Sequence, residues 1–419
     1  MSAAAIDQAA GVRVRYDPRH MANRWVALAI VFVTRTSMGF QFQSVAAVAP
    51  LMVADLQLTW VQLGSLFGIY LLPGAVIALP GGVLGQRFGD RRVVVISLAL
   101  MVAGGLVTAG AHGFIVAAAG RLLSGVGAVL MNILLAKMVA DWFVGRELST
   151  AMGIMLSSWP VGLGIAAATL GTLATRASWR VAIVATALGA ALGLVLIAFA
   201  YRNPPRAAAG ATRAAAGRVR LPAREIALAT SGGFAWGCFN ASLVAIIAFG
   251  PGLLMARGAS LGDAGFIVSL AIWLTMLSVP LGGLLSDRFG RPNLLIVAGS
   301  LVAAFVAMLI PASPHPLVAF CLLGLAIGAP PGALMALLPK VVPSERLATA
   351  LGVYYTIYYV VMAAVQLAAG GVRDLFGSPA APIYLAALVM AATILGFVVF
   401  RILERAYAAR HSTEADPPR

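Results

Sequence analysis

The stretch WRVAIVATALGAALGLVLIAFAY, residues Trp179–Tyr201, decides the fold class of this 419-residue chain. Arg180 is its single charged residue, and its polar and apolar residues do not alternate. A transmembrane helix needs about 20 consecutive apolar residues, whereas a membrane-spanning β-strand needs about 10 alternating ones. The stretch therefore predicts a helix that crosses a membrane.

The composition of the whole chain agrees with this stretch. Hydrophobic residues make up 61% of the chain and charged residues 10%. Soluble domains have about 25% charged residues, and a soluble protein of this length cannot bury so much apolar surface. Lipid leaves backbone polar groups without water, so the spans must be helices or a closed barrel. We expect an all-α membrane protein.

Twelve apolar runs of this kind follow one another, and we predict one span in each. They are Trp25–Ala47, Trp60–Gly82, Val93–Ala111, Phe114–Met138, Thr150–Ala174, Trp179–Tyr201, Glu225–Leu254, Gly265–Leu285, Leu294–Ala312, Pro316–Leu338, Leu347–Gly370 and Pro382–Arg401.

A basic segment divides these spans six and six. Residues 202–224 hold six arginines among alanines, glycines and prolines. We therefore predict an N-terminal six-helix bundle with its tail at residues 1–201, a cytoplasmic linker at 202–224, and a C-terminal six-helix bundle with its tail at 225–419.

The basic residues also predict the orientation. The net charge of +15 is compatible with a nucleic-acid partner, but Lys and Arg lie between the apolar runs, where they act as topology signals. With both termini in the cytoplasm, the outer loops hold only Arg176, Arg180, Arg257 and Arg373. We expect a multi-pass protein of an inner (plasma) membrane, with the lipid bilayer and no nucleic acid as partner, acting as a monomer.

Two loops of the chain repeat one another. GVLGQRFGDRR at residues 82–92 follows the second span, and GLLSDRFGRP at 283–292 follows the eighth. Gly89 and Gly290 are 201 positions apart and occupy the same place in the two copies. Internal repeats are common in secondary transporters, and glycines permit the tight turns.

The repeated loop resembles the G-x-L-x-D-R-x-G-R-R signature of the major facilitator superfamily. Gln86 stands where that signature has Asp, and Asp90 where it has Arg, so the first copy departs from the pattern. The resemblance implies gating or conformational roles for residues of both loops. These are Gln86, Arg87, Gly89, Asp90, Asp287, Arg288, Gly290 and Arg291.

Two further segments are similar to the same family. RLLSGVGA at residues 121–128 matches its R-x-x-x-G-x-G-A pattern, and WPVGLG at 159–164 is a weaker match to its G-P-x-x-G element. The resemblance implies two six-helix bundles around a central cavity, lined by the first, fourth, seventh and tenth helices. It also implies transport by alternating access.

Two arginines fall deep inside predicted spans. Arg35 follows Arg24 by eleven residues, roughly 16 Å at 1.5 Å per residue, and Arg121 lies roughly 10 Å from the outer end of the fourth span. An ionisable residue at such depth is a functional hypothesis by default. No Asp, Glu or His lies at mid-membrane, so we infer that a negatively charged substrate supplies the missing counter-charge.

Each arginine has a second interpretation. Arg121 occupies a position that resembles a family-wide motif, and a structural or gating role, with bonds to main-chain carbonyls of a neighbouring helix, is as well supported as ligand contact. Arg35 is explained by no general motif, and the alternative for it is an arginine that snorkels or binds carbonyl groups.

Polar and aromatic residues near these helix faces are candidates for the rest of the binding site, with helix–helix packing as the alternative for each. These candidates are Gln43, Asn132, Trp236, Asn240, Tyr355 and Tyr359.

Cofactor and metal chemistry is not expected. Cys238 and Cys321 both lie inside apolar runs, which argues against a disulfide framework or a zinc site. The four histidines form no H-E-x-x-H motif, and no nucleophile elbow is found. We therefore expect no metal, no cofactor and no enzymatic activity.

The expected function is secondary active or facilitative transport of a small anion: an organic acid, a monocarboxylate or a cyanate-like ion. Arg35, with Arg121 as a second candidate, would bind the negative charge. An arginine in the first span is similar to what several anion carriers of the family show, so the resemblance points to cyanate- and nitrate-like carriers, although the fifth span lacks the asparagine–glycine signature of nitrate carriers. Efflux of drugs or other organic solutes is the alternative. Without a membrane carboxylate as relay, exchange or facilitated diffusion is favoured over proton symport.

Overall fold

The computed structural model describes residues 18–77, 81–143, 147–203 and 221–414. Within these ranges, only the backbone is described at residues 18–22, 81–83, 86, 149, 287, 344, 345, 348 and 407–414. We call residues 18–203 the first half and residues 221–414 the second half. The end of the bundle at Asn203 and Leu221 is the linker end, and the end at Asp55 and Trp179 is the far end.

All described secondary structure is helical. The helices of the first half are α1 (Pro18–Ala47), α2 (Ala49–Leu56), α3 (Trp60–Leu71), α4 (Pro73–Ile77), α5 (Gly81–Phe88), α6 (Asp90–Ala109), α7 (Phe114–Trp142), α8 (Leu148–Arg176) and α9 (Trp179–Val195), which a π-turn extends over Leu196–Ala200. The helices of the second half are α10 (Ala223–Met255), α11 (Leu261–Phe289), α12 (Pro292–Leu309), α13 (Pro316–Ala326), α14 (Pro330–Met335), α15 (Ser344–Phe376) and α16 (Ala381–Glu414), with 3₁₀ turns at Ile310–Ala312 and Leu338–Lys340.

Twelve stretches of the described helices are long and apolar enough to cross a membrane, which confirms the predicted fold class. Each overlaps one predicted span. They are Asn23–Ala47, Trp60–Ile77, Asp90–Ala109, Phe114–Trp142, Thr150–Arg176, Trp179–Ala200, Ala223–Met255, Leu261–Ser286, Pro292–Ala312, Pro316–Lys340, Thr349–Phe376 and Ala381–Ala406.

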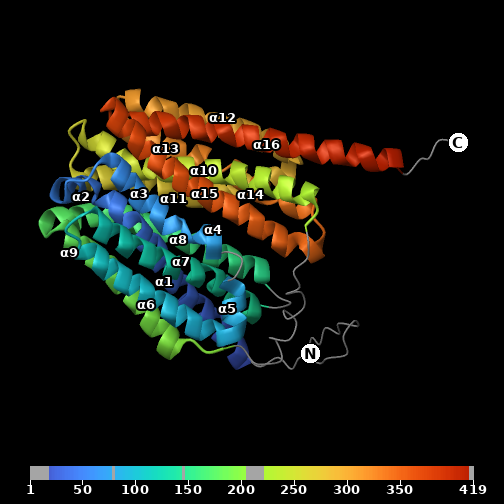
Figure 1. Cartoon of the computed structure of the whole chain (residues 1–419), viewed down its shortest axis with the longest axis horizontal. Helices are drawn as coiled ribbons and strands as arrows, with labels where there is room; N and C mark the ends of the chain where they lie inside the picture. The colour runs from blue at the N-terminus through green and yellow to red at the C-terminus, as the bar shows by residue number, and fades with distance from the viewer. Residues whose placement is uncertain (1–17, 78–80, 144–146, 204–220, 415–419) are drawn as a thin grey trace.

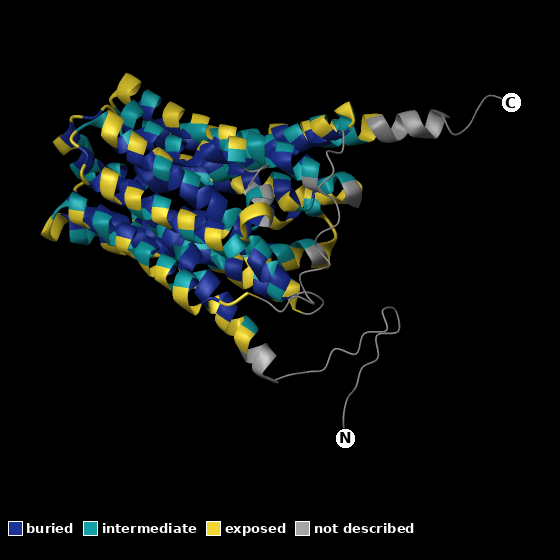
Figure 2. Cartoon of the chain, turned by 60° about the horizontal axis from the view of Figure 1, so that its bottom comes forward, coloured by how far each residue is buried: buried dark blue, intermediate teal, exposed yellow. Residues whose placement is uncertain are grey.

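The outer surface of the bundle is apolar, as lipid requires. Figure 2 shows exposed residues along the outer faces of the helices and buried residues between them. Large apolar side chains such as Ile115, Phe199 and Leu375 are among the most exposed. An apolar surface of this extent is costly in water and stable in lipid. The chain is a multi-pass membrane protein.

Local sequence determines where several helices begin. The Ser178 hydroxyl accepts a hydrogen bond from the main-chain N–H of Val181 (3.2 Å) and so caps α9. Thr59 and Gln62 form a reciprocal capping box at the start of α3. Both devices satisfy N–H groups that have no partner inside the helix.

Two of the predicted spans are interrupted. The second span is continuous in the prediction, but α3 ends at Leu71 and α4 begins at Pro73, because proline cannot donate the hydrogen bond that continues a helix. The tenth span breaks between α13 and α14, and α14 begins with Pro330 and Pro331. Gly328 lies at this break, and a Cβ there would approach the Ser278 carbonyl carbon to 2.3 Å.

Helix packing repeats between the halves of the chain. In the first half, α1 packs on α8, and α6 packs on both α7 and α9. In the second half, α10 packs on α15, and α12 packs on both α13 and α16. Counted by spans, each pair of the second half lies six places after its counterpart. Figure 1 shows the helices of the first half side by side in its lower part and those of the second half above them.

The two halves contact each other mainly through two helix pairs, α3 with α15 and α8 with α11. The first pair joins the second and eleventh spans, and the second pair joins the fifth and eighth spans. The repeat relates the second span to the eighth and the fifth to the eleventh, so the two pairs are equivalent. Close backbone approach explains the first contact. A Cβ on Gly64 would lie 2.2 Å from the Gln366 carbonyl oxygen, and one on Gly370 would lie 2.1 Å from that of Trp60. Both approaches lie in the far-end portion of the bundle.

The predicted domain boundary stays a prediction, because residues 204–220 of the linker lie outside the described residues.

Candidate functional site

The candidate site begins at a proline in α8. Pro160 lies inside this helix and has no N–H, so the carbonyl of Leu156, four residues earlier, loses its usual helical donor. The guanidinium of Arg35 donates to that carbonyl from Nη1 at 3.1 Å. The proline therefore creates an acceptor in the middle of the bundle, and α1 supplies the donor for it.

Other groups of the first half hold the same guanidinium. Arg35 Nη1 lies 3.0 Å from the Met155 carbonyl oxygen and 3.1 Å from the Ser158 hydroxyl. Its Nε donates to Asn132 Oδ1 at 2.8 Å. Asn132, one of the predicted site residues, is thus hydrogen-bonded directly to Arg35, from α7 to α1.

One nitrogen of Arg35 is not used by these contacts. Nη2 makes no hydrogen bond with any described residue, and the side chain is 6% exposed. No described carboxylate forms an ion pair with Arg35. Among the described residues, Tyr355, Tyr358 and Tyr359 of α15, in the second half, interact electrostatically with Arg35. A charged donor therefore lies near the boundary between the halves without a counter-ion among the described residues.

Arg121 has a different environment. It is 1% exposed, and its three nitrogens donate to the main-chain carbonyls of Leu66 (3.2 Å), Gln41 (3.0 Å) and Phe42 (3.2 Å). Its guanidinium also lies 4.3 Å from the ring centroid of Tyr70, in cation–π contact. These contacts engage all three nitrogens of the guanidinium and join α7 to α1 and α3, and they favour the structural role that the sequence left open.

The glycines of the same motif have a packing role. A Cβ on Gly125 would lie 2.2 Å from the Tyr70 carbonyl oxygen, and one on Gly127 would lie 2.2 Å from that of Ser97. The R-x-x-x-G-x-G-A segment therefore brings α7 close to both α3 and α6.

The remaining predicted site residues are distributed between the two halves. Gln43 is buried, and its Nε2 has no hydrogen-bond partner among the described residues. Asn240 donates from Nδ2 to the Trp236 carbonyl at 2.9 Å, one turn back in α10. Trp236 stacks on Phe239, with ring centroids 5.8 Å apart. Gln43 and Asn240 have no described contact with Arg35, so they remain predictions.

Tyr359 connects the second half to the first. A Cβ on Gly74 of α4 would lie 2.4 Å from Tyr359 Cδ2, so this ring packs directly on the α4 backbone. Beside it, the Thr356 hydroxyl donates to the Ala75 carbonyl at 3.0 Å. Residues Thr356 and Tyr359 of α15 thus contact the first half, and Tyr359 interacts electrostatically with Arg35.

Both repeated loops contain the expected glycine turn. Gly89 has φ +89° and Gly290 has φ +60°, values in the left-handed region that favours glycine. Asp90 begins α6 and pairs with Lys137 of α7. The acid that departs from the family signature therefore has a cation as partner within the first half.

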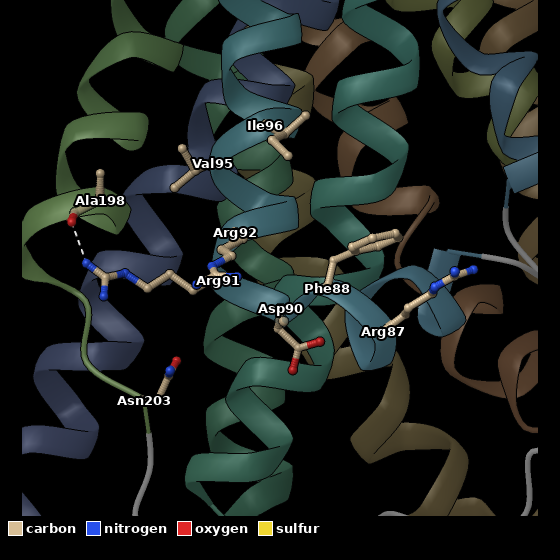
Figure 3. Close-up of a pocket in the computed structure, with 10 residues that line it drawn as sticks. Arg87, Phe88, Asp90, Arg91, Arg92, Val95, Ile96, Ala198 and Asn203 are labelled. Atoms are coloured by element: carbon tan, nitrogen blue, oxygen red, sulfur yellow. Dashed lines mark hydrogen bonds between the residues drawn. The ribbon is translucent and has the colours of Figure 1, made fainter.

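Figure 3 shows the pocket beside the first loop, which has a volume of about 870 Å³. Arg91 extends toward the end of α9 and donates to the carbonyls of Ile197 (3.1 Å) and Ala198, whereas Arg87 points away from them. Arg87, Arg288 and Arg291 are exposed. The side chains of Gln86 and Asp287 lie outside the described residues. The gating roles remain predictions.

Sequence reasoning missed a contact between the halves at the far end. Asp374 of α15 accepts hydrogen bonds from the main-chain N–H groups of Trp60 (2.9 Å) and Val61 (2.7 Å) at the start of α3. The Arg373 guanidinium lies 3.2 Å from the ring centroid of Trp60. The sequence signal was an adjacent Arg–Asp pair in a predicted outer loop, which gave no indication of a partner more than 300 residues away.

A second far-end acid is held within the first half. Arg180 Nη1 lies 2.6 Å from Asp55 Oδ2, and the Trp179 indole donates to the same oxygen at 3.1 Å. The hydrogen bond from Arg180, followed by that from Trp179, lowers the pKa of the Asp55 carboxyl. No described group of three or more His, Cys, Asp and Glu side chains is placed to hold a metal ion.

Comparison with known families agrees with this arrangement. The model of the Major Facilitator Superfamily matches residues 31–365 and, in an overlapping match, residues 233–418. The chain belongs to the Major Facilitator Superfamily. This superfamily consists of membrane transporters, so the transporter prediction is confirmed at that level.

Relatives within the superfamily differ in their substrates. The chain is 30% identical over 308 residues to the 3-(3-hydroxy-phenyl)propionate transporter of Escherichia coli, covering 71% of this chain and 73% of that protein. It is 25% identical over 395 residues to the lysosomal dipeptide transporter MFSD1 of Bos taurus, covering 86% and 82%. The inward open structure of the xylose transporter XylE from E. coli superposes with a TM-score of 0.73 at 14% identity, covering 89% and 96%. The last likeness shows the fold alone.

Proposed function

We propose that the protein carries a small organic carboxylate across a bacterial inner membrane by alternating access, with both termini in the cytoplasm. Arg35 binds the negative charge. The observation that carries the proposal is the state of its guanidinium, which lies near the middle of the predicted membrane span. Its Nη2 donates no hydrogen bond to a described residue, and no described carboxylate is its counter-ion.

The chemistry of a guanidinium supports an oxyanion as ligand. Charge-assisted hydrogen bonds from arginine to a carboxylate are about twice as strong as neutral ones. A buried cation without a counter-ion is costly, and an arriving anion relieves that cost. The contacts of Arg35 with α7 and α8 hold the guanidinium in one orientation, so little side-chain entropy remains to be lost on binding.

The relatives support a carboxylate in particular. The E. coli relative is named for a propionate and the bovine relative for dipeptides, and both of these substrates contain a carboxylate. The efflux alternative for cationic drugs has less support, because no described acid is placed near Arg35 to bind a cation. Arg121 is left out of the proposed site, since main-chain carbonyls use all three of its nitrogens.

The helix contacts support alternating access between two ends. The extensive contacts between described helices of different halves involve α3 and α4 with α15, α8 with α11, and α1 with α10. The Asp374 contacts and the Gly64 and Gly370 approaches close the far end. We therefore assign this conformation to the inward-facing state, which gives the cytoplasm access to Arg35.

Uptake into proteoliposomes tests the proposal. The probes are labelled lactate, butyrate, benzoate, 3-phenylpropionate and cyanate. We expect saturable uptake of at least one carboxylate, and we expect Arg35→Gln to reduce it by about 10- to 100-fold, the range for a hydrogen bond to a charged group. Arg176→Gln is the matched control, because it removes one positive charge from an exposed position on α8. Uptake equal in wild type and Arg35→Gln, or uptake no faster than in empty liposomes for every probe, contradicts the proposal.

A further inference from the structure

A continuous row of aromatic rings extends across the second half beside Arg35. In α15, the ring centroids of Tyr355 and Tyr358 are 6.0 Å apart, and those of Tyr358 and Tyr359 are 5.0 Å apart. Tyr358 also stacks on Trp236 of α10 at 6.4 Å with an interplanar angle of 23°. We call Trp236, Tyr355, Tyr358 and Tyr359 the aromatic row. All four side chains are half-buried.

The three tyrosine hydroxyl groups of this row, those of Tyr355, Tyr358 and Tyr359, have no hydrogen-bond partner in the part of the chain that the structure describes. None of the three oxygen atoms is completely buried. Buried tyrosine hydroxyls usually find a partner, as the Tyr70 hydroxyl does at the Met38 carbonyl. Three partly accessible hydroxyls without partners, this deep in the protein, indicate a surface that meets water or a ligand.

The tyrosines of the row face the half of the protein that contains Arg35. Tyr359 packs on the α4 backbone of the first half, Thr356 beside it donates to the Ala75 carbonyl, and the three tyrosines interact electrostatically with the Arg35 guanidinium. A ligand that contacts Arg35 through its charged end can therefore contact the row with its body. Binding sites for small molecules combine aromatic walls with a few placed polar groups in this way.

We propose that the aromatic row binds an aromatic ring of the substrate, so that the preferred cargo is a phenyl-bearing monocarboxylate whose carboxylate lies on Arg35. This proposal rests on the proposed function and names its substrate class. Stacked and edge-to-face ring contacts favour an aromatic ring over a saturated ring of the same size. The unpartnered tyrosine hydroxyls provide hydrogen bonds for a polar substituent on that ring.

Calorimetry on the purified full-length protein tests the subsite with two matched acids. The acids are 3-phenylpropionate and 3-cyclohexylpropionate, which have the same carboxylate and the same number of carbon atoms but differ in the π system. We expect 3-phenylpropionate to bind about 10-fold more tightly, as two or three ring contacts would give. A preference of less than about 2-fold in the wild type overturns the proposal.

Variants locate the preference. Tyr358→Leu should remove it by weakening 3-phenylpropionate binding while leaving the affinity for 3-cyclohexylpropionate nearly unchanged. Tyr384→Leu is the control, because Tyr384 is an exposed tyrosine of α16 outside the row. Tyr355→Phe retains the ring and should preserve the preference for 3-phenylpropionate. This variant shows that a substitution within the row leaves a folded protein that binds ligand. Equal loss for both acids in Tyr358→Leu contradicts a ring subsite.

The outcomes separate this proposal from the proposed function. If both acids bind equally and both depend on Arg35, the aromatic subsite is wrong and carboxylate transport stands. If neither acid binds, or if Arg35→Gln binds both as tightly as the wild type does, both proposals fail.

Discussion

The Asp374 carboxylate joins the two halves of the protein by accepting hydrogen bonds from the main-chain N–H groups of Trp60 (2.9 Å) and Val61 (2.7 Å). An acid at a helix N-terminus satisfies unpaired donors and interacts favourably with the helix dipole. Here the acid belongs to α15 and the helix is α3. This contact therefore stabilises the conformation in which the far end is closed.

We predict that Asp374→Asn shifts the protein toward a state in which the far end of the bundle is open. Loss of the charged acceptor should weaken closure by about 1 kcal/mol, a population change of roughly 5-fold. Electron–electron distance measurements between spin labels at Gln57 and Ala256, in a background with Cys238 and Cys321 replaced, should show a larger fraction of long distances. The control is Asp55→Asn, because the ion pair of Asp55 with Arg180 lies within the first half. If the distance distribution of Asp374→Asn matches that of the wild type, Asp374 does not stabilise closure of the far end.

A second prediction concerns the glycine approach between the same helices. A Cβ at position 370 would lie 2.1 Å from the Trp60 carbonyl oxygen, a distance that requires the backbones to separate. We expect Gly370→Leu to prevent far-end closure and to lower the transport rate by more than about 10-fold. Gly153→Ala in α8 is the control, since a Cβ there meets nothing within 4 Å. Transport at the wild-type rate in Gly370→Leu would show that this contact is not part of the cycle.

Arg121 should affect stability and not substrate affinity. Arg121→Gln removes donors from the buried carbonyls of Leu66, Gln41 and Phe42. We expect the free energy of unfolding to fall by about 3 kcal/mol, with the carboxylate Kd unchanged within about 2-fold. Denaturant unfolding in detergent and calorimetry measure the two quantities. A tenfold weaker Kd with unaltered stability would place Arg121 in the binding site instead.

Coupling follows from the positions of the acids. No described Asp or Glu is placed near Arg35 to relay a proton, and membrane carriers driven by protons usually use such a group. We predict that unlabelled substrate on the opposite side of the liposome membrane accelerates uptake, and that a protonophore does not reduce it. Uptake that requires an inward proton gradient and shows no acceleration by counter-substrate would contradict exchange or facilitated diffusion.

The sequence predicted what depends on local chemistry. Hydropathy located all twelve spans, and most of the predicted ends lie within a few residues of the observed ones. Burial in lipid requires an apolar segment of a set length, which hydropathy detects. The repeat predicted the turns at Gly89 and Gly290, since a left-handed backbone favours glycine. Depth along the helix singled out Arg35 and Arg121, and both are buried, whereas Arg373, which was predicted in an outer loop, is buried as well.

Contacts between distant segments were beyond that reasoning. The hydropathy of α8 does not show that Pro160 frees the Leu156 carbonyl for Arg35, because the donor comes from another helix. The partners of Asp374 lie 314 and 313 residues away along the chain. Tyr358 was not among the predicted site residues, since its stacking on Trp236 depends on how α10 and α15 pack.

The central claim is that Arg35 recognises negative charge, and the affinity of one matched ligand pair tests it most directly. 3-Phenylpropionate and its neutral amide, 3-phenylpropanamide, have the same shape and differ in charge at physiological pH. We predict that the wild type binds the acid about 10- to 100-fold more tightly than the amide, and that Arg35→Gln binds the two equally. An acid-to-amide affinity ratio in Arg35→Gln as large as that of the wild type would contradict the account.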